Sequence, residues 1–600
     1  MMEKPKLKRK EKLALLLQEI EELITFVQEW EAKYHTKIAQ VHPQYTESAR
    51  NLVHYCALRS KNLDSLQRRL GNFGLSRLSE AEAHIMASLT TTRAILKSML
   101  DEKCKFPKQQ LSFKKSRQLI RRNAKALLGY RSQGRRTRIM VTLPDKAADD
   151  YPLVQDMIRS GMNCARINCA HETPEDWQKM IGHIHHAAGQ LRKTCKVSMD
   201  LSGPKIRTGM IAEDAKVVKI QFEKDAFGNE IRPIQVFFGK ADEEEQIIPV
   251  IPITGYNPNL IKEGDILHFT DTRFKEREIE ISRISAKGFV GNLNKVTFFE
   301  TGLPLKLAEQ IIFSIGELEE KKKPIFLREN DYLIIRRDLA EGHRKKILDE
   351  GEIEPACISC TYPEIFSMVK AGEPVLFDDG VMAGIIEEVD ADEMRVRITE
   401  VSDKGGKLRP DKGINFPQSK LDLPGLSEQD RANLPFVLAN ADVINLSFVN
   451  RASDVSSFLE IFKTTERQIG LLLKIETGAG FENLSDIILT AMQIYPIGVM
   501  IARGDLAVEL GWIRIGRVQE EILSMCKAAH ITSIWATQVL ENLAKKGIPS
   551  RAEITDAVMA QRADCIMLNK GPFIIKAIKL LDTILKNLGS QPTALKPIQE

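Results

Sequence analysis

Long apolar runs, strong net charge and abundant cysteine are all lacking in this chain of 600 residues. No apolar stretch reaches the roughly 20 residues of a transmembrane helix, and no signal-peptide pattern is visible. The formal net charge of +5 is small for this length and argues against a general nucleic-acid role. Nine cysteines, mostly inside apolar segments, are typical of reduced thiols. We therefore expect a cytoplasmic protein of several domains, without a membrane or nucleic-acid partner.

Short β-branched segments alternate with amphipathic stretches over much of the chain. Eight such segments begin at Arg136, Gly161, Cys195, Ala441, Ile469, Ile497, Ile531 and Ala563. This alternation predicts an α/β fold, a (β/α)8 TIM barrel, whose active site lies at the C-terminal ends of the strands. Polar side chains do fall at those expected ends, namely Arg166, Asn168, Asp200, Ser447, Lys474, Glu476, Asp505 and Thr537.

The rest of the chain is expected to form parts outside the barrel. Helical periodicity predicts an N-terminal all-α domain with a basic linker over residues 1–130. The barrel would occupy residues 131–209 and 413–590, interrupted by a β-rich lid domain at 210–412 and followed by a tail at 591–600.

Two features stand out in these outer parts. Within the insert, GDILHFTDTRFKEREIEISRI from Gly264 resembles GEPVLFDDGVMAGIIEEVDADEMRVRI from Gly372, which favours a duplicated small β-barrel over two unrelated hairpins. Residues 103–138 contain thirteen Lys or Arg and no acid. Because few aromatic residues interrupt this run, a solvated linker helix is favoured over a nucleic-acid contact.

Lys474, Glu476 and Asp505 carry the strongest chemical signal. The first two stand two residues apart in LLLKIE, and Asp505 follows the next apolar run, in IGVMIARGD. Side chains two apart on a strand point the same way, so we expect all three at one edge of the barrel. Carboxylates can hold a hard divalent ion such as Mg²⁺, and an ammonium can neutralise a phosphoryl or enolate group. Such pairs also occur without chemistry, and the eight-strand pattern around this one favours a catalytic role.

Ten motifs follow one another in order along the expected strand ends. They read GMNCARINCAHET, DLSGPKIRTG, FDDGVMAGI, DKGINFP, LDLPGLSEQD, SFVNRASDV, LKIETGAGFENL, VMIARGDLAVEL, WATQVLEN and PSRAEITDAVMAQRADCIML. Together they resemble the pyruvate kinase family over residues 135–590, except for parts of the insert, which is larger than that family's lid. Ten motifs in register are far more specific than any single one.

The resemblance implies a phosphotransferase that acts on phosphoenolpyruvate and ADP in the last step of glycolysis, with Mg²⁺ or Mn²⁺ as cofactor. Glu476 and Asp505 would then ligate the metal, and Lys474 would stabilise the phosphoryl group in flight and the enolate that remains. The resemblance implies further roles for Thr537 (protonation of the enolate carbon), Arg166 and Arg207 (phosphate oxygens), Gly504 (substrate carboxylate), and Thr142, His171, Lys412 and, from the lid, Asp379 (nucleotide).

Some positions depart from the family pattern. Residues 142–145 read TLPD where the family has Thr-x-Gly-Pro, and residues 569–572 read NKGP where it has Ser-Gly-Glu-Thr. The family's C-terminal domain for sugar-phosphate activators has no expected counterpart. We therefore expect retained phosphoryl-transfer groups, slower turnover and no such activation.

A monovalent cation site is altered as well. The resemblance implies that Asn168 and Asp200 are the remnants of a K⁺ site, with Ala170 in place of a serine. Lys205 stands where potassium-requiring members carry a glutamate, and Leu201 also matches the potassium-independent pattern. An ammonium can replace the charge of a missing ion, so we expect no requirement for K⁺.

Two other functions remain open from the sequence. The same barrel groups suit a lyase or aldolase that handles pyruvate enolate, and the helical N-terminal region could belong to a non-catalytic binding protein. The retained Arg207, Lys412 and Asp379 favour a kinase over the lyase or aldolase. Retention of the expected Mg²⁺ and phosphoryl-transfer residues argues against the non-catalytic binding protein. A homo-oligomer formed through the barrel faces is expected.

Overall fold

A computed structural model describes most of the chain. The described residues are 8–102, 106, 108, 110–212, 217–222, 233–240, 248–308, 310–318, 324–347, 353–462, 465 and 467–587. The tail predicted for residues 591–600 lies outside them. The chain forms two compact units, the first of residues 1–206, 368–381 and 413–600, and the second of residues 207–367 and 382–412.

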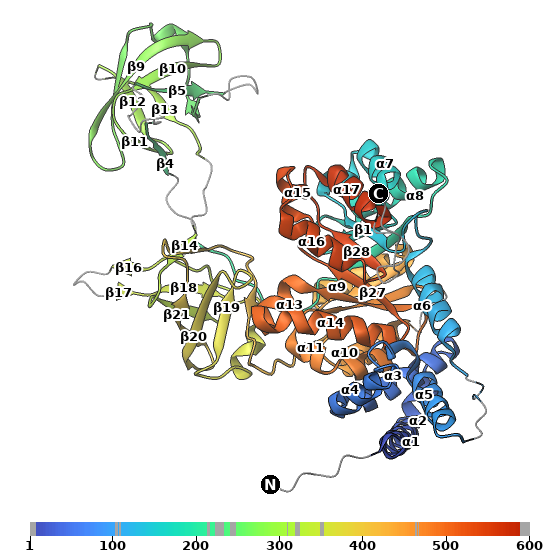
Figure 1. The fold of residues 1–600 in the computed structure, drawn as a ribbon. Coiled ribbons are helices and arrows are strands. Elements are labelled where there is room, and N and C mark those ends of the chain that lie inside the picture. The colour runs from blue at the N-terminus through green and yellow to red at the C-terminus, as the bar shows by residue number, and fades with distance from the viewer. Residues whose placement is uncertain are drawn as a thin grey trace. The chain divides into compact units, whose positions relative to one another are not determined.

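The first unit is built on a closed barrel of eight parallel strands, which confirms the predicted TIM barrel (Figure 1). Its strands are almost wholly buried on both faces, as expected when helices cover a parallel sheet. The last strand closes on the first, with Arg138 opposite Cys565. The strands in barrel order are β1 (Arg138–Thr142), β2 (Cys164–Asn168), β3 (Lys196–Asp200), β24 (Val443–Leu446), β25 (Gly470–Ile475), β26 (Ile497–Ala502), β27 (Thr532–Ala536) and β28 (Cys565–Leu568).

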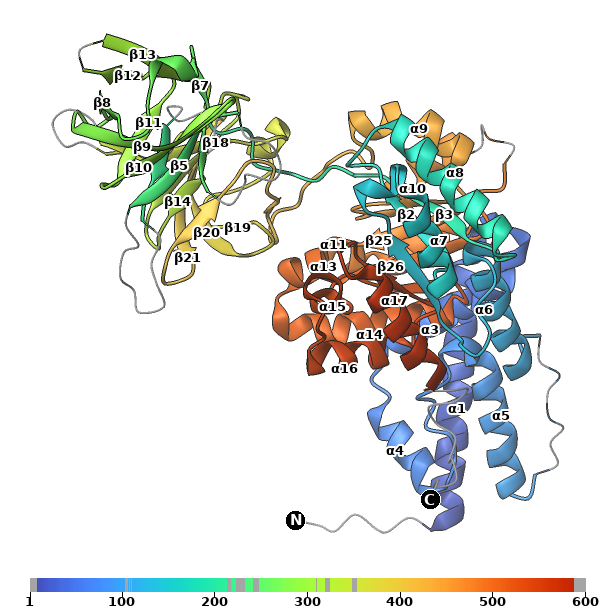
Figure 2. The same cartoon turned by 90° about the horizontal axis from the view of Figure 1, so that it is seen from above.

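Helices follow the barrel strands along the chain and surround them, as Figure 2 shows from a second direction. They are α7 (Tyr151–Ser160), α8 (Pro174–Gln190), α9 (Glu428–Asn440), α10 (Ala452–Phe462), α11 (Gly478–Glu482), α12 (Leu484–Ala491), α13 (Arg503–Leu510), α14 (Trp512–Ala528), α15 (Glu541–Lys546), α16 (Arg551–Ala560) and α17 (Ile574–Asn587).

The N-terminal region is helical, as predicted, and also belongs to the first unit. Leucine and isoleucine side chains along one face of its first helix are buried against the following helices, as expected for a 3.6-residue period. The helices are α1 (Arg9–Lys33), α2 (His35–Gln40), α3 (Thr46–Arg59), α4 (Asp64–Asn72), α5 (Ile85–Met99) and α6 (Phe113–Leu128).

Helix α6 closes the base of the barrel. It begins after Ser112, whose hydroxyl accepts a hydrogen bond from the Lys115 N–H at 3.2 Å, and ends at Gly129 with φ of 76°. Leu127 packs directly over Gly470 and Gly498 at the starts of two strands, where a Cβ atom would lie within 3 Å of the leucine methyls. These positions therefore require glycine.

The prediction of a solvated linker helix is wrong for one face of α6. The side chains of Leu127 and Leu128 lie in a buried cluster with residues from the barrel strands. Only the face that carries Arg117, Arg121 and Lys125, spaced four residues apart, is exposed.

Buried hydrogen bonds also join the N-terminal helices to the barrel. The Tyr45 hydroxyl accepts from the Ile497 N–H at 2.9 Å, at the first residue of β26. The Asn51 amide donates to the Ala528 carbonyl at 2.8 Å, and the Asn123 amide donates to the His530 carbonyl at 2.7 Å. The N-terminal region is thus bonded to the barrel at specific backbone groups.

The second unit is rich in β-strands, as predicted for the insert. An eight-stranded sheet has the order β6-β5-β10-β9-β8-β12-β13-β7, and β4 pairs with β11. The strands are β4 (Val217–Ile220), β5 (Ile234–Gly239), β6 (Val250–Ile251), β7 (Ile253–Thr254), β8 (Ile266–Thr270), β9 (Glu276–Ser285), β10 (Gly288–Leu293), β11 (Thr297–Glu300), β12 (Pro304–Leu307) and β13 (Gln310–Ile315).

A further group of strands in this unit contains the run β18-β15-β21-β20 and the pairs β14–β22 and β16–β17. The two similar sequence segments lie in different sheets, since the first forms the antiparallel pair β8–β9 and the second contributes to the pair β20–β21. Their duplication stays a prediction. The strands are β14 (Ile325–Leu327), β15 (Tyr332–Arg336), β16 (Lys346–Ile347), β17 (Ile353–Glu354), β18 (Ala356–Ser359), β20 (Met382–Val389), β21 (Glu393–Glu400) and β22 (Gly406–Leu408), while β19 (Pro374–Phe377) and β23 (Ile414–Asn415) pair within the first unit.

The bond between Tyr45 and β26 gives a test of the docked N-terminal region. Tyr45→Phe leaves the Ile497 N–H buried without a partner, so we expect the free energy of unfolding to fall by about 1–3 kcal/mol. Urea denaturation of the full-length chain measures this difference. Tyr34→Phe is the matched control, because the Tyr34 hydroxyl makes no hydrogen bond with a described residue. Equal stability of the two variants would contradict the prediction.

Candidate functional site

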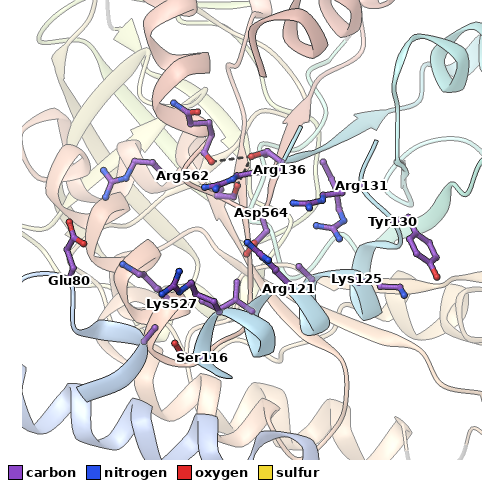
Figure 3. A pocket seen from close by; sticks show the side chains of 18 of the residues that line it. Glu80, Ser116, Arg121, Lys125, Tyr130, Arg131, Arg136, Lys527, Arg562 and Asp564 are labelled. Atoms are coloured by element: carbon purple, nitrogen blue, oxygen red, sulfur yellow. Dashed lines mark hydrogen bonds between the residues drawn. The ribbon is translucent and has the colours of Figure 1, made fainter. Parts of the chain in front are cut away.

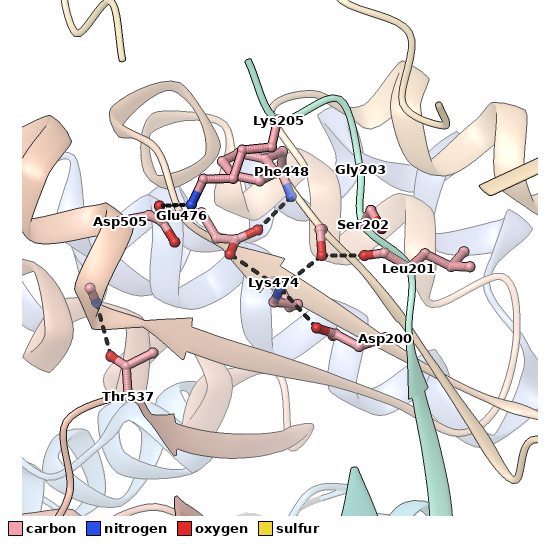
Figure 4. A network of polar contacts seen from close by, with 12 residues as sticks. Asp200, Leu201, Ser202, Gly203, Lys205, Phe448, Lys474, Glu476, Asp505 and Thr537 are labelled. Carbon is pink, nitrogen blue, oxygen red and sulfur yellow. Dashed lines mark hydrogen bonds and ion pairs between the residues drawn. The ribbon is translucent and has the colours of Figure 1, made fainter. Parts of the chain in front are cut away.

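Strand β25 carries a lysine to the C-terminal end of the barrel, where it meets two carboxylates. Lys474 is only 8% exposed, and Glu476, just beyond the strand, is 3% exposed. The Lys474 ammonium lies 3.2 Å from Glu476 Oε1 and 3.3 Å from Asp200 Oδ2 (Figure 4). It also donates to Ser447 Oγ at 2.7 Å, and that hydroxyl donates in turn to the Leu201 carbonyl at 2.6 Å. These contacts hold the ammonium in one position.

An arginine from β2, the strand adjacent to β3, shares the Asp200 carboxylate. Arg166, in β2, forms an ion pair with Asp200 and donates to Thr142 Oγ1 at 3.0 Å. Asp200 Oδ1 and Arg166 Nε are buried and have no hydrogen-bond partner among the described residues. Because buried polar atoms are normally paired, these two groups are available to a bound ligand.

The charges of this network support one another. Burial alone would lower the pKa of Lys474, but the carboxylates of Asp200 and Glu476 raise it above its ordinary value. Burial would raise the pKa of Asp200, yet the charges of Arg166 and Lys474 hold it below its ordinary range. The pKa of Glu476 is raised by burial and by the nearby Asp505 carboxylate, despite the Lys474 charge. Lys474 therefore stays cationic in a site from which water is largely excluded.

Glu476 and Asp505 are the oxygen donors that could hold a divalent cation. Glu476 Oε2 accepts from the Phe448 N–H at 2.7 Å, while Asp505 Oδ1 lies 2.8 Å from the Lys205 ammonium. The repulsion between the two carboxylates is of the kind that a cation relieves, and hard cations prefer oxygen ligands. No group of three or more His, Cys, Asp or Glu suited to a metal occurs in the described part of the chain. The protein would thus supply two ligands, with substrate and water supplying the others.

Thr537 is held at the end of β27 by its neighbours. Its Oγ1 accepts from the Gly504 N–H at 2.9 Å, and its backbone is left-handed, with φ of 64°. Arg503 donates to the Thr537 carbonyl at 2.6 Å and to Asp556 Oδ2 at 2.8 Å. The Gly504 N–H that we expected to meet a substrate carboxylate is therefore occupied by Thr537 in this structure.

Other predicted residues lie outside this network. His171 is exposed in the turn after β2, and the Asn168 side chain accepts from the Ala170 N–H at 3.4 Å. The Lys205 ammonium contacts Asp505, not Asp200, and lies 3.9 Å from Asp379. Asp379 belongs to segment 368–381 of the first unit.

The remaining two nucleotide candidates belong to the second unit. Arg207 donates from its guanidinium to the Asp411 carbonyl at 3.0 Å. The Lys412 N–H donates to Thr208 Oγ1 at 2.9 Å. Both residues are thus held by the two short segments that join the units in sequence.

Sequence reasoning missed the groups that orient the candidates. The sequence places Ser447 at a strand end and predicts no role for it. In the structure its hydroxyl makes the shortest contact of the Lys474 ammonium. The pair Arg503–Asp556, which holds Thr537, joins residues 53 positions apart. No local pattern marks such a pair, so only the folded chain reveals it.

The sequence of the chain is similar to those of known proteins. A family model described as the barrel domain of pyruvate kinase matches residues 134–248 and 314–573. The chain is 33% identical over 228 residues to the pyruvate kinase of Kluyveromyces lactis, a match that covers 37% of this chain and 44% of the relative. It is 34% identical over 232 residues to human pyruvate kinase PKLR (38% and 39%) and 33% identical over 257 residues to the Geobacillus stearothermophilus pyruvate kinase (41% and 42%).

These matches span less than half the length of each relative named. The family model, however, covers more than half of this chain, including the strands that carry Lys474, Glu476 and Asp505. The chain therefore belongs to the pyruvate kinase family.

Proposed function

We propose that this protein transfers the phosphoryl group of phosphoenolpyruvate to ADP, forming pyruvate and ATP in the last step of glycolysis. The observation that carries the proposal is the buried Lys474 ammonium, fixed by Asp200, Ser447 and Glu476 at the C-terminal end of the barrel. Phosphoryl transfer depends on positioned positive charge more than on covalent chemistry. A cation fixed in this way suits that need.

Lys474, Arg166 and Thr537 would each have a separate role in this reaction. Lys474 would neutralise the transferring phosphoryl group and then the enolate oxygen, and Arg166 would bind phosphate oxygens through its unpaired Nε. The departing enolate takes a proton at its methylene carbon, close to Thr537. Water exclusion around these groups would protect the phosphoryl group from hydrolysis.

The divalent cation of the family fits the donor set. Glu476 and Asp505 would hold Mg²⁺ or Mn²⁺, which would supply Lewis-acid stabilisation of negative charge on the substrate. Lys205, which contacts Asp505 in this structure, would have to move or share that carboxylate. Thr142, His171, Arg207, Lys412 and Asp379 are proposed for the nucleotide, Gly504 for the substrate carboxylate, and Asn168 with Asp200 for the remnant K⁺ site.

The proposal also covers the location and the oligomeric state of the protein. Within the described residues, the helices are all too short or too polar to cross a membrane. We propose a cytoplasmic enzyme that forms homo-oligomers through its barrel faces.

A lyase or aldolase acting on pyruvate enolate is the second candidate. It is favoured by the altered loop after β28, where the family's serine and glutamate are replaced. Release of pyruvate from phosphoenolpyruvate without any nucleotide, or turnover of a 2-oxo acid, would support it. ADP-dependent formation of ATP in a coupled assay would support the kinase.

The altered turns after β1 and β28 are joined by an ion pair. Lys570 pairs with Asp145 and lies 3.9 Å from Glu172, which follows β2. The hydrogen bond from Lys570 and a second one with Glu172 lower the pKa of Asp145 to about 2. Burial and the hydrogen bond with Asp145 raise the pKa of Glu172 to about 7. The two departures from the family pattern thus form one cluster of charged side chains.

The role of Lys474 can be tested by removing its charge. Lys474→Met should lower kcat by about 10²-fold or more, because the interaction is made chiefly in the transition state. A coupled assay with phosphoenolpyruvate, Mg²⁺ and ADP measures kcat, and calorimetry measures substrate binding, which should persist. Lys196→Met is the matched control, since Lys196 pairs with Asp442 at the other end of a barrel strand. A Lys474→Met enzyme that keeps a tenth of the activity would exclude the role.

The proposed loss of the K⁺ requirement has its own measurement. Activity at constant ionic strength should be the same in KCl and in tetramethylammonium chloride, since the Lys205 ammonium, which pairs with Asp505, would replace the charge of the missing ion. Omitting Mg²⁺ should abolish activity in both buffers. A tenfold or larger stimulation by K⁺ would disprove the proposal, because it corresponds to about 1.4 kcal/mol of stabilisation that the chain lacks.

Glu172 predicts a pH-dependent loss of stability. Its folded pKa lies above its ordinary value, so the folded state holds the proton more tightly and loses stability as pH rises from about 4.5 to 7. Glu172→Gln has no such proton to lose, and its Tm should rise relative to that of the wild type between pH 5 and 8. Thermal unfolding across this range measures the difference. Glu175→Gln, an exposed change in the first turn of α8, is the control and should show a constant difference.

A further inference from the structure

A cavity lies at the opposite end of the barrel from Lys474. This cavity, of about 810 Å³, is bounded by α6, by the segment that leads into β1, by residues just before β28 and by the end of α14 (Figure 3). Arg138 is the first residue of β1, and Asp564 immediately precedes β28, so the cavity is at the N-terminal ends of the strands. All of it lies within the first unit.

The lining of this basal cavity is strongly basic. Eight of its nineteen lining residues are Lys or Arg, against two carboxylates, Glu80 and Asp564. The spacing of Arg117, Arg121 and Lys125 along α6 places three of these cations on one helix face. The chain as a whole carries a formal charge of only +5, so this concentration is local.

Several of these cations already have partners. Arg138 donates to the Gly129 carbonyl at 2.8 Å, Lys527 lies 3.0 Å from Glu82, and Arg562 pairs with Glu520. They contribute charge but have little donor capacity to spare.

Three arginines have their donors unused. The guanidinium groups of Arg121, Arg131 and Arg136 make no hydrogen bond or ion pair with any residue that the structure describes. They come from α6, from the segment after it and from the residues before β1, and all three line the cavity (Figure 3). Each guanidinium can bind a phosphate group through two parallel hydrogen bonds.

Burial and the same charges lower the pKa of a neighbouring histidine. The pKa of His84, which also lines the cavity, is lowered first by burial and then by the charges of Lys527 and Arg117. An additional positive charge is thus disfavoured there, whereas an anion would be attracted.

We propose that the basal cavity binds a small anion that bears two or more phosphate groups. Its volume falls within the roughly 300–1,000 Å³ of ordinary small-molecule sites. Three guanidinium groups from three separate segments offer three pairs of parallel donors, which suits an anion with several linked phosphate groups. Nucleic acid fits less well, because Tyr130 is the only large aromatic side chain in the lining and the Lys125 ammonium lies 4.1 Å from its ring centroid.

Binding would act on the contact between the N-terminal helices and the barrel. The ligand would neutralise cations on α6 and beside β1 together, and α6 is the helix whose leucines close the barrel base. We expect bound anion to raise the Tm of the full-length protein by mass action.

Calorimetry on the full-length protein in metal-free buffer tests the proposal. Inorganic tripolyphosphate, pyrophosphate and a hexose bisphosphate are the probes, and their relative affinities distinguish an inorganic from a sugar ligand. We expect saturable binding of one anion per chain, with tripolyphosphate bound at least about tenfold more tightly than orthophosphate. Binding should persist in Lys474→Met, because the site is remote from that lysine.

Variants of the cavity make the test specific. Arg121→Gln and Arg136→Gln should each weaken tripolyphosphate binding by about tenfold, while Lys114→Gln, an exposed α6 change outside the cavity, should leave it unchanged. Unchanged Tm values without ligand would show that each variant is folded. Equal binding by all three variants, loss of binding in Lys474→Met, or tighter, length-dependent binding of a single-stranded oligonucleotide would overturn the proposal.

Discussion

The buried ammonium of Lys474 is the constraint on which the site depends. A charge held in a water-poor environment is costly unless opposite charges surround it, and the barrel supplies Asp200 and Glu476 for that purpose. Those carboxylates are themselves buried, so Asp200 needs Arg166 and Glu476 needs the Phe448 N–H in turn. The network is therefore complete only when several strands end at the same level.

The barrel base presents the opposite arrangement. There the N-terminal helix α6 inserts leucines over Gly470 and Gly498 and exposes its arginines on the other face. One helix thereby closes the apolar interior and places unpaired cations beside a cavity. The N-terminal region is consequently part of the barrel's structure, bonded to it through Tyr45, Asn51 and Asn123.

Residues that depart from the family pattern contact one another in the folded chain. Lys570 and Asp145 replace different family motifs at positions far apart in the chain, yet they form an ion pair at the barrel rim. Glu172 joins them and keeps its proton because burial and a neighbouring carboxylate disfavour its charged form. Lys205 similarly contacts Asp505, one of the two proposed metal ligands.

The sequence by itself determined the barrel, the helical N-terminal region and the placement of Lys474, Glu476 and Asp505 at strand ends. It could do so because strand periodicity and strand order place polar residues at one edge regardless of detailed packing. The tertiary structure alone decided that α6 is half buried, that Gly504 donates to Thr537, and that Arg503 pairs with Asp556. These outcomes depend on contacts between residues distant in sequence, whose energies depend on burial and geometry and leave no periodic signal in the chain.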